Sequence, residues 1–321
     1  MKQILTVFLC MLCVVSFSQS VTDSINEEDA KRHINYFASD KLRGRVNFTK
    51  EQLEAANYIS KEFTSYGLQP QLPYTCFYQP FLTSPGYTMP AGLACDTLID
   101  KVLYNVVGVL PGKSRPDEII IFSAHYDHIS DGSFEQIFNG ANDNASGTAA
   151  VLMLAKYFSM RHDNERTIVF CLFAGEELGL LGSSAFVNRI TDLDKIKAVI
   201  NIEMIGSTNR TGKNGFFVTG SDYSDVAAIL KKNLKGEKVK VRSEGADVTG
   251  LYYRSDNYPF AKKGIPAHSI MCSDDNEPCY HKPCDDVKWI DTKNMTKIIQ
   301  AIAKGCTTLI SGEDTPRRIK L

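Results

Sequence analysis

Short apolar stretches alternate with longer stretches of helical length over most of the chain. The apolar stretches that predict buried strands cover residues 103–110, 118–124, 167–173, 196–202 and 268–271. The stretches that predict helices cover residues 147–158, 179–189, 222–234 and 292–309. Continuously apolar strands joined by helices are typical of a mostly parallel sheet that is covered on both faces. The pattern therefore predicts an α/β fold with a central β-sheet and helices on both faces.

The part of the chain before this alternation has a different pattern. Residues 24–66 predict helix with an interruption near residues 43–47, and we expect residues 29–66 to pack on the main domain. Residues 75–82 predict one further strand. The sequence has no repeat of fixed period. Its length allows one large domain or two small ones, and we expect residues 19–321 to form a single domain.

The first residues have the layout of a secretory signal peptide. Lys2 precedes an apolar run over residues 4–17, and Ser16 and Ser18 place small side chains just before a cleavage point. The run is too short to span a bilayer; a membrane anchor is the alternative interpretation. We expect residues 1–18 to be removed and the mature chain to act in the periplasm or outside the cell, without a membrane.

Composition and charge exclude several classes of protein. The chain of 321 residues is 43% hydrophobic and 23% charged, which is ordinary for a soluble globular protein. Its 36 basic and 37 acidic residues give a formal net charge of −1. This balance lacks the basic field that binding to nucleic acid requires, so we expect no nucleic-acid partner.

Cysteines are too few for a disulfide scaffold, so the apolar core must carry the fold. Cys171 and Cys306 lie in apolar stretches and are predicted to be buried thiols. We expect one bridge between Cys76 and Cys95 and a second bridge within a later cluster. That cluster consists of Cys272, Cys279 and Cys284.

Polar side chains follow the predicted strands at one edge of the sheet. They are His125 and Asp127 after strand 118–124, Glu176 and Glu177 after strand 167–173, Glu203 after strand 196–202, and His281 after strand 268–271. Asp143 lies in the loop before helix 147–158. Because the carboxyl ends of parallel strands meet at one edge, we expect these side chains to converge. Imidazoles and carboxylates together suit zinc, or two zinc ions that share a carboxylate.

Each of these residues also has a simpler interpretation when taken alone. Asp143 is typical of a helix N-cap, and the acidic pair is typical of the first turn of a helix. His125 alone is more often a hydrogen-bonded histidine at a strand end. Glu203 is harder to dismiss because it interrupts an apolar stretch. The convergence of all of them at one sheet edge favours a metal site.

The same residues lie in four short motifs that resemble a known family. The motifs are His125-Tyr126-Asp127, Asn142-Asp143-Asn144-Ala145-Ser146-Gly147, Glu176-Glu177-Leu178-Gly179 and Tyr280-His281. In this order they resemble the co-catalytic dizinc exopeptidases typified by secreted bacterial leucyl aminopeptidase, whose superfamily includes glutamate carboxypeptidases and glutaminyl cyclases. The resemblance covers residues 29–310. It implies a single-domain phosphorylase/hydrolase-like sandwich.

The resemblance also implies a metal-binding role for five residues. Two Zn²⁺ per chain would share the carboxylate of Asp143. His125 and Glu203 would complete one zinc site, and Glu177 and His281 would complete the other. Relatives usually carry aspartate where Glu203 stands, so this ligand is one methylene longer than expected.

Further roles follow from the same resemblance. Glu176 would be the general base, and Asp127 would accept the second N–H of His125. Tyr252 falls where several relatives have a tyrosine that hydrogen-bonds the oxyanion. Asn257 stands where relatives often have histidine and cannot act as a base. A cis peptide bond after Asp143 is also implied.

An acid-rich site of this kind would attract a free α-ammonium group. We therefore expect a zinc-dependent aminopeptidase that acts on peptides with a free N-terminus. We also expect the protein to be a monomer. A carboxypeptidase is one alternative, but it would need clustered arginines, and Arg242 and Arg254 are the nearby candidates. A glutaminyl cyclase with a single zinc is another alternative. A non-catalytic binding homologue is the last, although such proteins lose metal ligands.

Overall fold

The structure is a computed structural model that describes residues 24–88, 98–133, 135–245 and 250–321. The predicted signal peptide, residues 1–18, and the predicted bridge partner Cys95 lie outside these residues. Within the described ranges, no helix is both long enough and apolar enough to cross a membrane.

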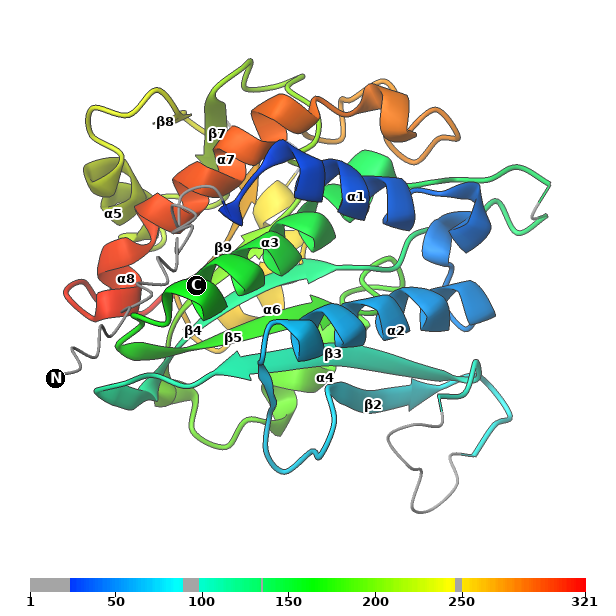
Figure 1. The fold of residues 1–321 in the computed structure, drawn as a ribbon, viewed down its shortest axis with the longest axis horizontal. Coiled ribbons are helices and arrows are strands. Elements are labelled where there is room, and N and C mark those ends of the chain that lie inside the picture. The colour runs from blue at the N-terminus through cyan, green and yellow to red at the C-terminus, as the bar shows by residue number, and fades with distance from the viewer. Residues whose placement is uncertain (1–23, 89–97, 134, 246–249) are drawn as a thin grey trace, which may run out of the picture.

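A nine-stranded sheet runs through the centre of the described chain (Figure 1). Its strands are β1 (Gln69–Pro70), β2 (Tyr78–Thr83), β3 (Val102–Leu110), β4 (Arg115–His125), β5 (Arg166–Phe173), β6 (Ile196–Ile202), β7 (Gly215–Val218), β8 (Lys240–Val241) and β9 (Ala267–Met271). Their order is β1-β3-β5-β4-β6-β9-β7-β8, and β2 also pairs with β3. The central strands β5, β4, β6 and β9 are parallel. Antiparallel pairs lie toward the two sides, where β3 joins β5 and β7 joins β9. The predicted α/β fold is thus confirmed.

Helices cover both faces of the sheet (Figure 1). They are α1 (Glu27–Phe37), α2 (Lys50–Ser65), α3 (Ser146–Arg161), α4 (Leu181–Arg189), α5 (Val226–Asn233), α6 (Asn257–Ala261), α7 (Thr292–Gly305) and α8 (Thr307–Ser311). Successive side chains of a strand point to opposite faces, and β4 shows the result. Ile120 and Phe122 belong to the apolar core beneath α1, α2, α3 and α7. Ile121 belongs to the core beneath α4 and α6.

Side-chain caps determine where several helices begin. The side chain of Asn26 accepts a hydrogen bond from the backbone of Asp29 at 2.8 Å, which starts α1. Thr49 caps α2 in the same way, through Gln52. Each cap satisfies a backbone N–H that the first helical turn leaves without a partner. The expected interruption between the two helices is a short 3₁₀ segment, Asp40–Arg45.

Some elements differ from the sequence-based prediction. The helix expected over residues 292–309 is divided into α7 and α8. The short elements α6 and β7 were not predicted. α6 has five residues and contains Pro259, and β7 has four residues, so neither shows a full period of its own. Both depend on packing against the parallel strands.

The parallel strands end together at one edge of the sheet. His125 at the end of β4 is in register with Phe173 at the end of β5. Ile202 ends β6, which pairs with β4 on its other side. The residues that follow these strands therefore meet at a single place.

Candidate metal centre

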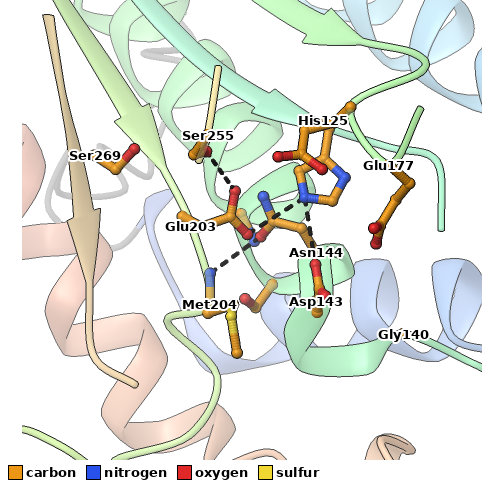
Figure 2. Close-up of polar contacts among 12 residues, drawn as sticks. His125, Gly140, Asp143, Asn144, Glu177, Glu203, Met204, Ser255 and Ser269 are labelled. Carbon is orange, nitrogen blue, oxygen red and sulfur yellow. Dashed lines mark hydrogen bonds and ion pairs between the residues drawn. The ribbon is translucent and has the colours of Figure 1, made fainter. Parts of the chain in front are cut away.

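His125, Asp143 and Glu203 form a first cluster of metal-ligand type (Figure 2). Nε2 of His125 lies 3.3 Å from Oδ1 of Asp143. The same nitrogen lies 3.3 Å from Oε1 of Glu203. All three side chains are almost completely buried. The three side chains come from separate segments, namely the end of β4, the loop before α3 and the residue after β6.

A second cluster lies on the other side of the Asp143 carboxylate. Oδ2 of Asp143 is 3.0 Å from Nε2 of His281. That nitrogen is also 3.3 Å from Oε2 of Glu177. The two oxygens of Asp143 therefore face two different histidines. The structure brings together all five residues that were predicted as metal ligands.

The loop that carries Asp143 is held by hydrogen bonds to its backbone. Asp285 accepts from the backbone N–H groups of Asn142 at 2.8 Å and Asp143 at 3.0 Å. Asn144 donates to the carbonyl of Ile202 at 3.0 Å, which ties the loop to the end of β6. The peptide bond between Asp143 and Asn144 is cis, as predicted. These contacts aim the Asp143 carboxylate between the two histidines.

Gly147 is required by the same close approach. A Cβ atom at this position would lie 2.2 Å from the carbonyl oxygen of Ile202. Displacing these backbone atoms would cost folding free energy. Any larger residue at position 147 would therefore push the start of α3 away from the end of β6. The glycine in the motif thus keeps Asp143 and Glu203 within reach of the same histidine.

Asp127 takes a somewhat different role from the one predicted. Nδ1 of His125 lies 3.1 Å from the backbone carbonyl of Asp127 and 3.7 Å from its carboxylate. The carbonyl, not the carboxylate, is therefore the nearer acceptor. The carboxylate accepts from the backbone N–H groups of Glu176 at 3.2 Å and Glu177 at 3.3 Å. It also accepts from Asn47 at 2.7 Å. Asp127 thus holds the turn that carries the acidic pair.

The electrostatics separate the acids of the site into two groups. Burial opposes the charge on Asp143, but hydrogen bonds from His125 and His281 hold its pKa well below the ordinary range. Burial likewise opposes the charge on Glu177, yet hydrogen bonds from its histidine neighbours lower its pKa. Burial and the nearby Glu177 carboxylate raise the pKa of Glu176 well above the ordinary range. The site thus favours the ionised form of Asp143 and Glu177, which a metal ligand needs, and disfavours the ionised form of Glu176.

The histidines respond to the excess of acids around them. Burial opposes the charge on His125, but the carboxylates of Glu203 and Glu176 raise its pKa well above the ordinary value. Burial also opposes the charge on His281, while Asp143 and Glu177 raise its pKa to about 10. These carboxylates need cations to balance them when buried. Nitrogen and oxygen donors in this arrangement fit zinc.

A cavity opens over the two clusters. Glu176 lines it beside the metal ligands, and Met204, Leu251 and Met271 form an apolar wall. Tyr280 also lines it and stacks on His281 with ring centroids 3.9 Å apart. The structure therefore places Glu176 in the same cavity as the predicted metal ligands.

Tyr252 is not among the residues that line this cavity. Its ring is buried and stacks on Tyr223 with centroids 4.7 Å apart. Asn257 is buried nearby and donates to the backbone carbonyl of Tyr252 at 3.0 Å. The oxyanion role implied by the resemblance would require Tyr252 to reach the predicted metal ligands. The structure does not bring it there.

A disulfide bond between Cys279 and Cys284 closes the loop that carries His281. It confirms the predicted bridge within the later cysteine cluster. The free cysteines of the described chain, Cys171, Cys272 and Cys306, are all buried.

Arg45 is a structural residue of the site that the sequence pattern did not predict. Its guanidinium is completely buried and donates to the carbonyls of Tyr126 at 2.8 Å and Asn139 at 2.7 Å. Burial lowers its pKa to about 10, although the acids nearby oppose this shift. It joins the end of β4 to the segment before Asp143. A lone arginine between two helices gives no local indication of such a role.

The fold and the site together define an α/β protein with a candidate metal centre at the carboxyl ends of its parallel strands. Peptidase family M28 matches residues 105–305. The chain belongs to this family, which confirms the resemblance seen in its motifs.

Individual proteins similar to this chain include aminopeptidases and a cyclase. Aminopeptidase YwaD of Bacillus subtilis is 27% identical over 238 residues, which cover 72% of this chain and 50% of the relative. The chain thus spans about half the length of the curated relatives it matches. The solved structure of BSAP, a zinc aminopeptidase from Bacillus subtilis, has a TM-score of 0.68 at 16% identity and covers 91% of this chain and 97% of that one.

Glutaminyl cyclase from Porphyromonas gingivalis has a solved structure with the same fold. Its TM-score is 0.66 at 18% identity, covering 90% of this chain and 98% of that one. At such low identity, likeness between structures shows the fold alone. The chemistry therefore depends on the residues of the site and not on the fold alone.

Proposed function

We propose that the protein is a zinc aminopeptidase that binds two Zn²⁺ and hydrolyses the first peptide bond of peptides with a free N-terminus. The observation that carries this proposal is the position of Asp143. Its Oδ1 faces His125 at 3.3 Å and its Oδ2 faces His281 at 3.0 Å. One carboxylate divided between two ligand clusters is suited to two ions about 3.5–4 Å apart.

The residues would divide the metal-binding and proton-transfer work between them. His125, Asp143 and Glu203 would hold one ion, and Asp143, Glu177 and His281 would hold the other. Zinc, when bound, supplies a Lewis acid that polarises the scissile carbonyl and favours ionisation of water. Glu176 would take a proton from the attacking water and later deliver it to the leaving amine. It lines the cavity beside the predicted ligands, where both proton transfers would take place.

The cavity supports recognition of an N-terminal residue. Its acids favour a free α-ammonium group over a free carboxylate. Met204, Leu251 and Met271 line one wall, and their apolar surfaces favour an uncharged aliphatic first side chain. We therefore propose aliphatic N-terminal residues as the preferred substrates.

A carboxypeptidase function has less support from the same cavity. Arg254 is a lining residue, but its guanidinium is paired with Asp275 at 2.6 Å. Arg242 packs its side chain against Gly215 and does not line the cavity. Neither arginine is thus available to grip a substrate carboxylate.

We also propose that the protein is exported and acts as a monomer in the periplasm or outside the cell. The layout of residues 1–18 and the disulfide bond between Cys279 and Cys284 support this proposal, because such bonds persist in oxidising compartments. The balanced net charge of −1 favours peptides over nucleic acid as partners.

One experiment separates the candidate functions. The zinc-loaded protein is assayed on a panel of aminoacyl amides, the same amides with an N-acetyl group, and N-terminal glutaminyl peptides. Each reaction is repeated after treatment with a chelator and after zinc is restored. Release of the amine from free but not acetylated substrates, lost with chelator and regained with zinc, is the expected result. Cyclisation of glutaminyl peptides without hydrolysis would instead identify a cyclase.

A further inference from the structure

His128 is a buried histidine of the site that the roles above do not use. It follows Asp127 and is only 1% exposed. Its backbone forms a parallel bridge with Val46, which anchors the residue beyond the end of β4. Nδ1 of the ring lies 3.0 Å from Oε1 of Glu177. His128 therefore contacts a predicted metal ligand through the oxygen that does not face His281.

The direction of this hydrogen bond follows from the chemistry of the partner. An ionised carboxylate oxygen only accepts, so Nδ1 of His128 carries the hydrogen and donates it. The other oxygen of Glu177, Oε2, lies 3.3 Å from Nε2 of His281. The two oxygens of Glu177 thus have separate partners. One is held by His128, and the other faces the second ligand cluster.

The packing around His128 leaves its ring little freedom. A Cβ atom added to Gly140 would lie 2.6 Å from Cγ and Cδ2 of the imidazole, so only a glycine leaves room for the ring. The ring also meets His281 edge to face, with centroids 5.7 Å apart. Because the ring is fixed, the hydrogen bond to Glu177 has a fixed direction.

The geometry favours a supporting role for His128 over direct binding of metal. Its Nδ1 is 3.9 Å from Oδ2 of Asp143, whereas Nε2 of His281 is 3.0 Å from that oxygen. Within the described chain, Nε2 of His128 is buried and has no hydrogen-bond partner. The ligand atoms of His128, Asp143 and Glu177 nevertheless lie within 4.8 Å of one another. The test must therefore also detect direct binding of metal by His128.

We infer that His128 is a positioning residue that holds Glu177 as a one-oxygen ligand of the second zinc. Oε1 of Glu177 accepts the hydrogen bond from His128, and Oε2 is the oxygen that faces His281 and the second cluster. A ligand that is already oriented loses less side-chain freedom on binding, and partners of this kind typically change metal affinity by about 10–100-fold. The inference rests on the proposed function, because it requires the second cluster to bind zinc.

The test uses two amide substitutions that place their N–H groups differently. The amide of asparagine matches the position of Nδ1, so His128→Asn retains a donor toward Glu177. The longer side chain in His128→Gln carries its amide toward the position of Nε2 and removes that donor. His128→Phe removes all hydrogen bonding and keeps a ring. His33→Phe is the matched control, because His33 is also buried and contacts Tyr58 and Arg32 instead of the site.

The readouts are zinc equivalents per chain after dialysis and the rate at which each equivalent passes to a coloured chelator. Thermal unfolding of the zinc-free proteins identifies any variant that does not fold. We expect His128→Phe and His128→Gln to release one of two equivalents about 10–100-fold faster than wild type. His128→Asn and His33→Phe should release both at rates close to wild type.

The outcomes distinguish the inference from its rivals. Zinc release from His128→Gln and His128→Phe at the wild-type rate would overturn it. Loss of one equivalent from His128→Asn as well would show that His128 is itself a ligand, which also overturns it. Wild-type protein that retains no zinc would overturn the proposed function together with this inference, whereas two retained equivalents leave the variants to decide.

Discussion

Oε1 of Glu203 lies 3.3 Å from Nε2 of His125, although the glutamate is one methylene longer than the aspartate expected from the family motif. The longer side chain is held at its other oxygen, where Ser255 donates a hydrogen bond at 2.9 Å. Asn201 donates in turn to Ser255 at 2.8 Å (Figure 2 shows the Ser255 contact). The site therefore accommodates the extra methylene without withdrawing the carboxylate from the ligand cluster.

Substitutions at Glu203 test whether this carboxylate binds metal. Glu203→Ala should lose one of two zinc equivalents and most of the activity, because the first cluster then keeps only His125 and Asp143. Glu203→Asp should retain both equivalents with altered affinity for one of them. Zinc content and aminopeptidase rate are measured on the same preparations. If Glu203→Ala keeps both equivalents and the full rate, another group completes the first cluster.

The neighbouring acids Glu176 and Glu177 should differ in their response to amidation. Glu176→Gln should keep its zinc and lower kcat by about 10²–10⁴-fold, because it removes proton transfer and no ligand. Glu177→Gln should lose zinc from the second cluster. Metal analysis and steady-state kinetics of both variants decide the assignment. The reverse pattern would exchange the two roles.

Asp285 should matter for stability through the loop that carries Asp143. Asp285→Ala leaves two buried backbone N–H groups, those of Asn142 and Asp143, without their acceptor. Each such group costs about 1–3 kcal/mol of folding free energy. Urea unfolding of the zinc-free protein should show this loss, and zinc affinity should fall with it. The exposed Asp222→Ala is the control, and equal stability of the two variants would contradict the prediction.

The free energy of unfolding should depend on pH through His33. Arg32 lies 3.2 Å from Nε2 of His33 and can only donate, so that nitrogen must stay unprotonated. Burial and the charge of Arg32 accordingly lower the pKa of His33 to about 4 from an ordinary value of 6.5. The unfolded chain then binds more protons than the native chain between these pH values. Stability should therefore fall as the pH drops from 6.5 toward 4, by up to about 3 kcal/mol from this residue.

Comparison of variants isolates the contribution of His33. His33→Phe cannot titrate, so the difference in unfolding free energy between wild type and this variant should shrink as the pH falls through that range. Denaturant unfolding of the zinc-free proteins measures it and removes any effect of metal release. His162→Gln, at an exposed position, controls for the loss of an imidazole. A difference that is constant with pH would show that His33 titrates normally in the native state.

The sequence by itself determined the central strands and the residues at their carboxyl ends. Strands such as β4 and β5 are buried on both faces, so their apolar stretches are continuous and clear. His125 ends β4, Glu177 lies in the turn after β5 and Glu203 follows β6. The topology of a parallel sheet brings such residues together. For the loop at Asp143, the resemblance to a family motif implied a shared ligand and a cis peptide bond, and the cis bond is present.

Only the tertiary structure decided how those ligands are supported. Arg45, His128 and Asp285 act through contacts with residues far away in sequence, and no local pattern distinguishes them from ordinary polar residues. The nearer acceptor for His125 is the carbonyl of Asp127 at 3.1 Å, a choice of atom that depends on backbone geometry. Tyr252 stacks on Tyr223 and does not line the cavity, although its neighbour Leu251 does. Ligand identity thus follows from local chemistry, whereas ligand orientation depends on long-range packing that the order of residues alone does not display.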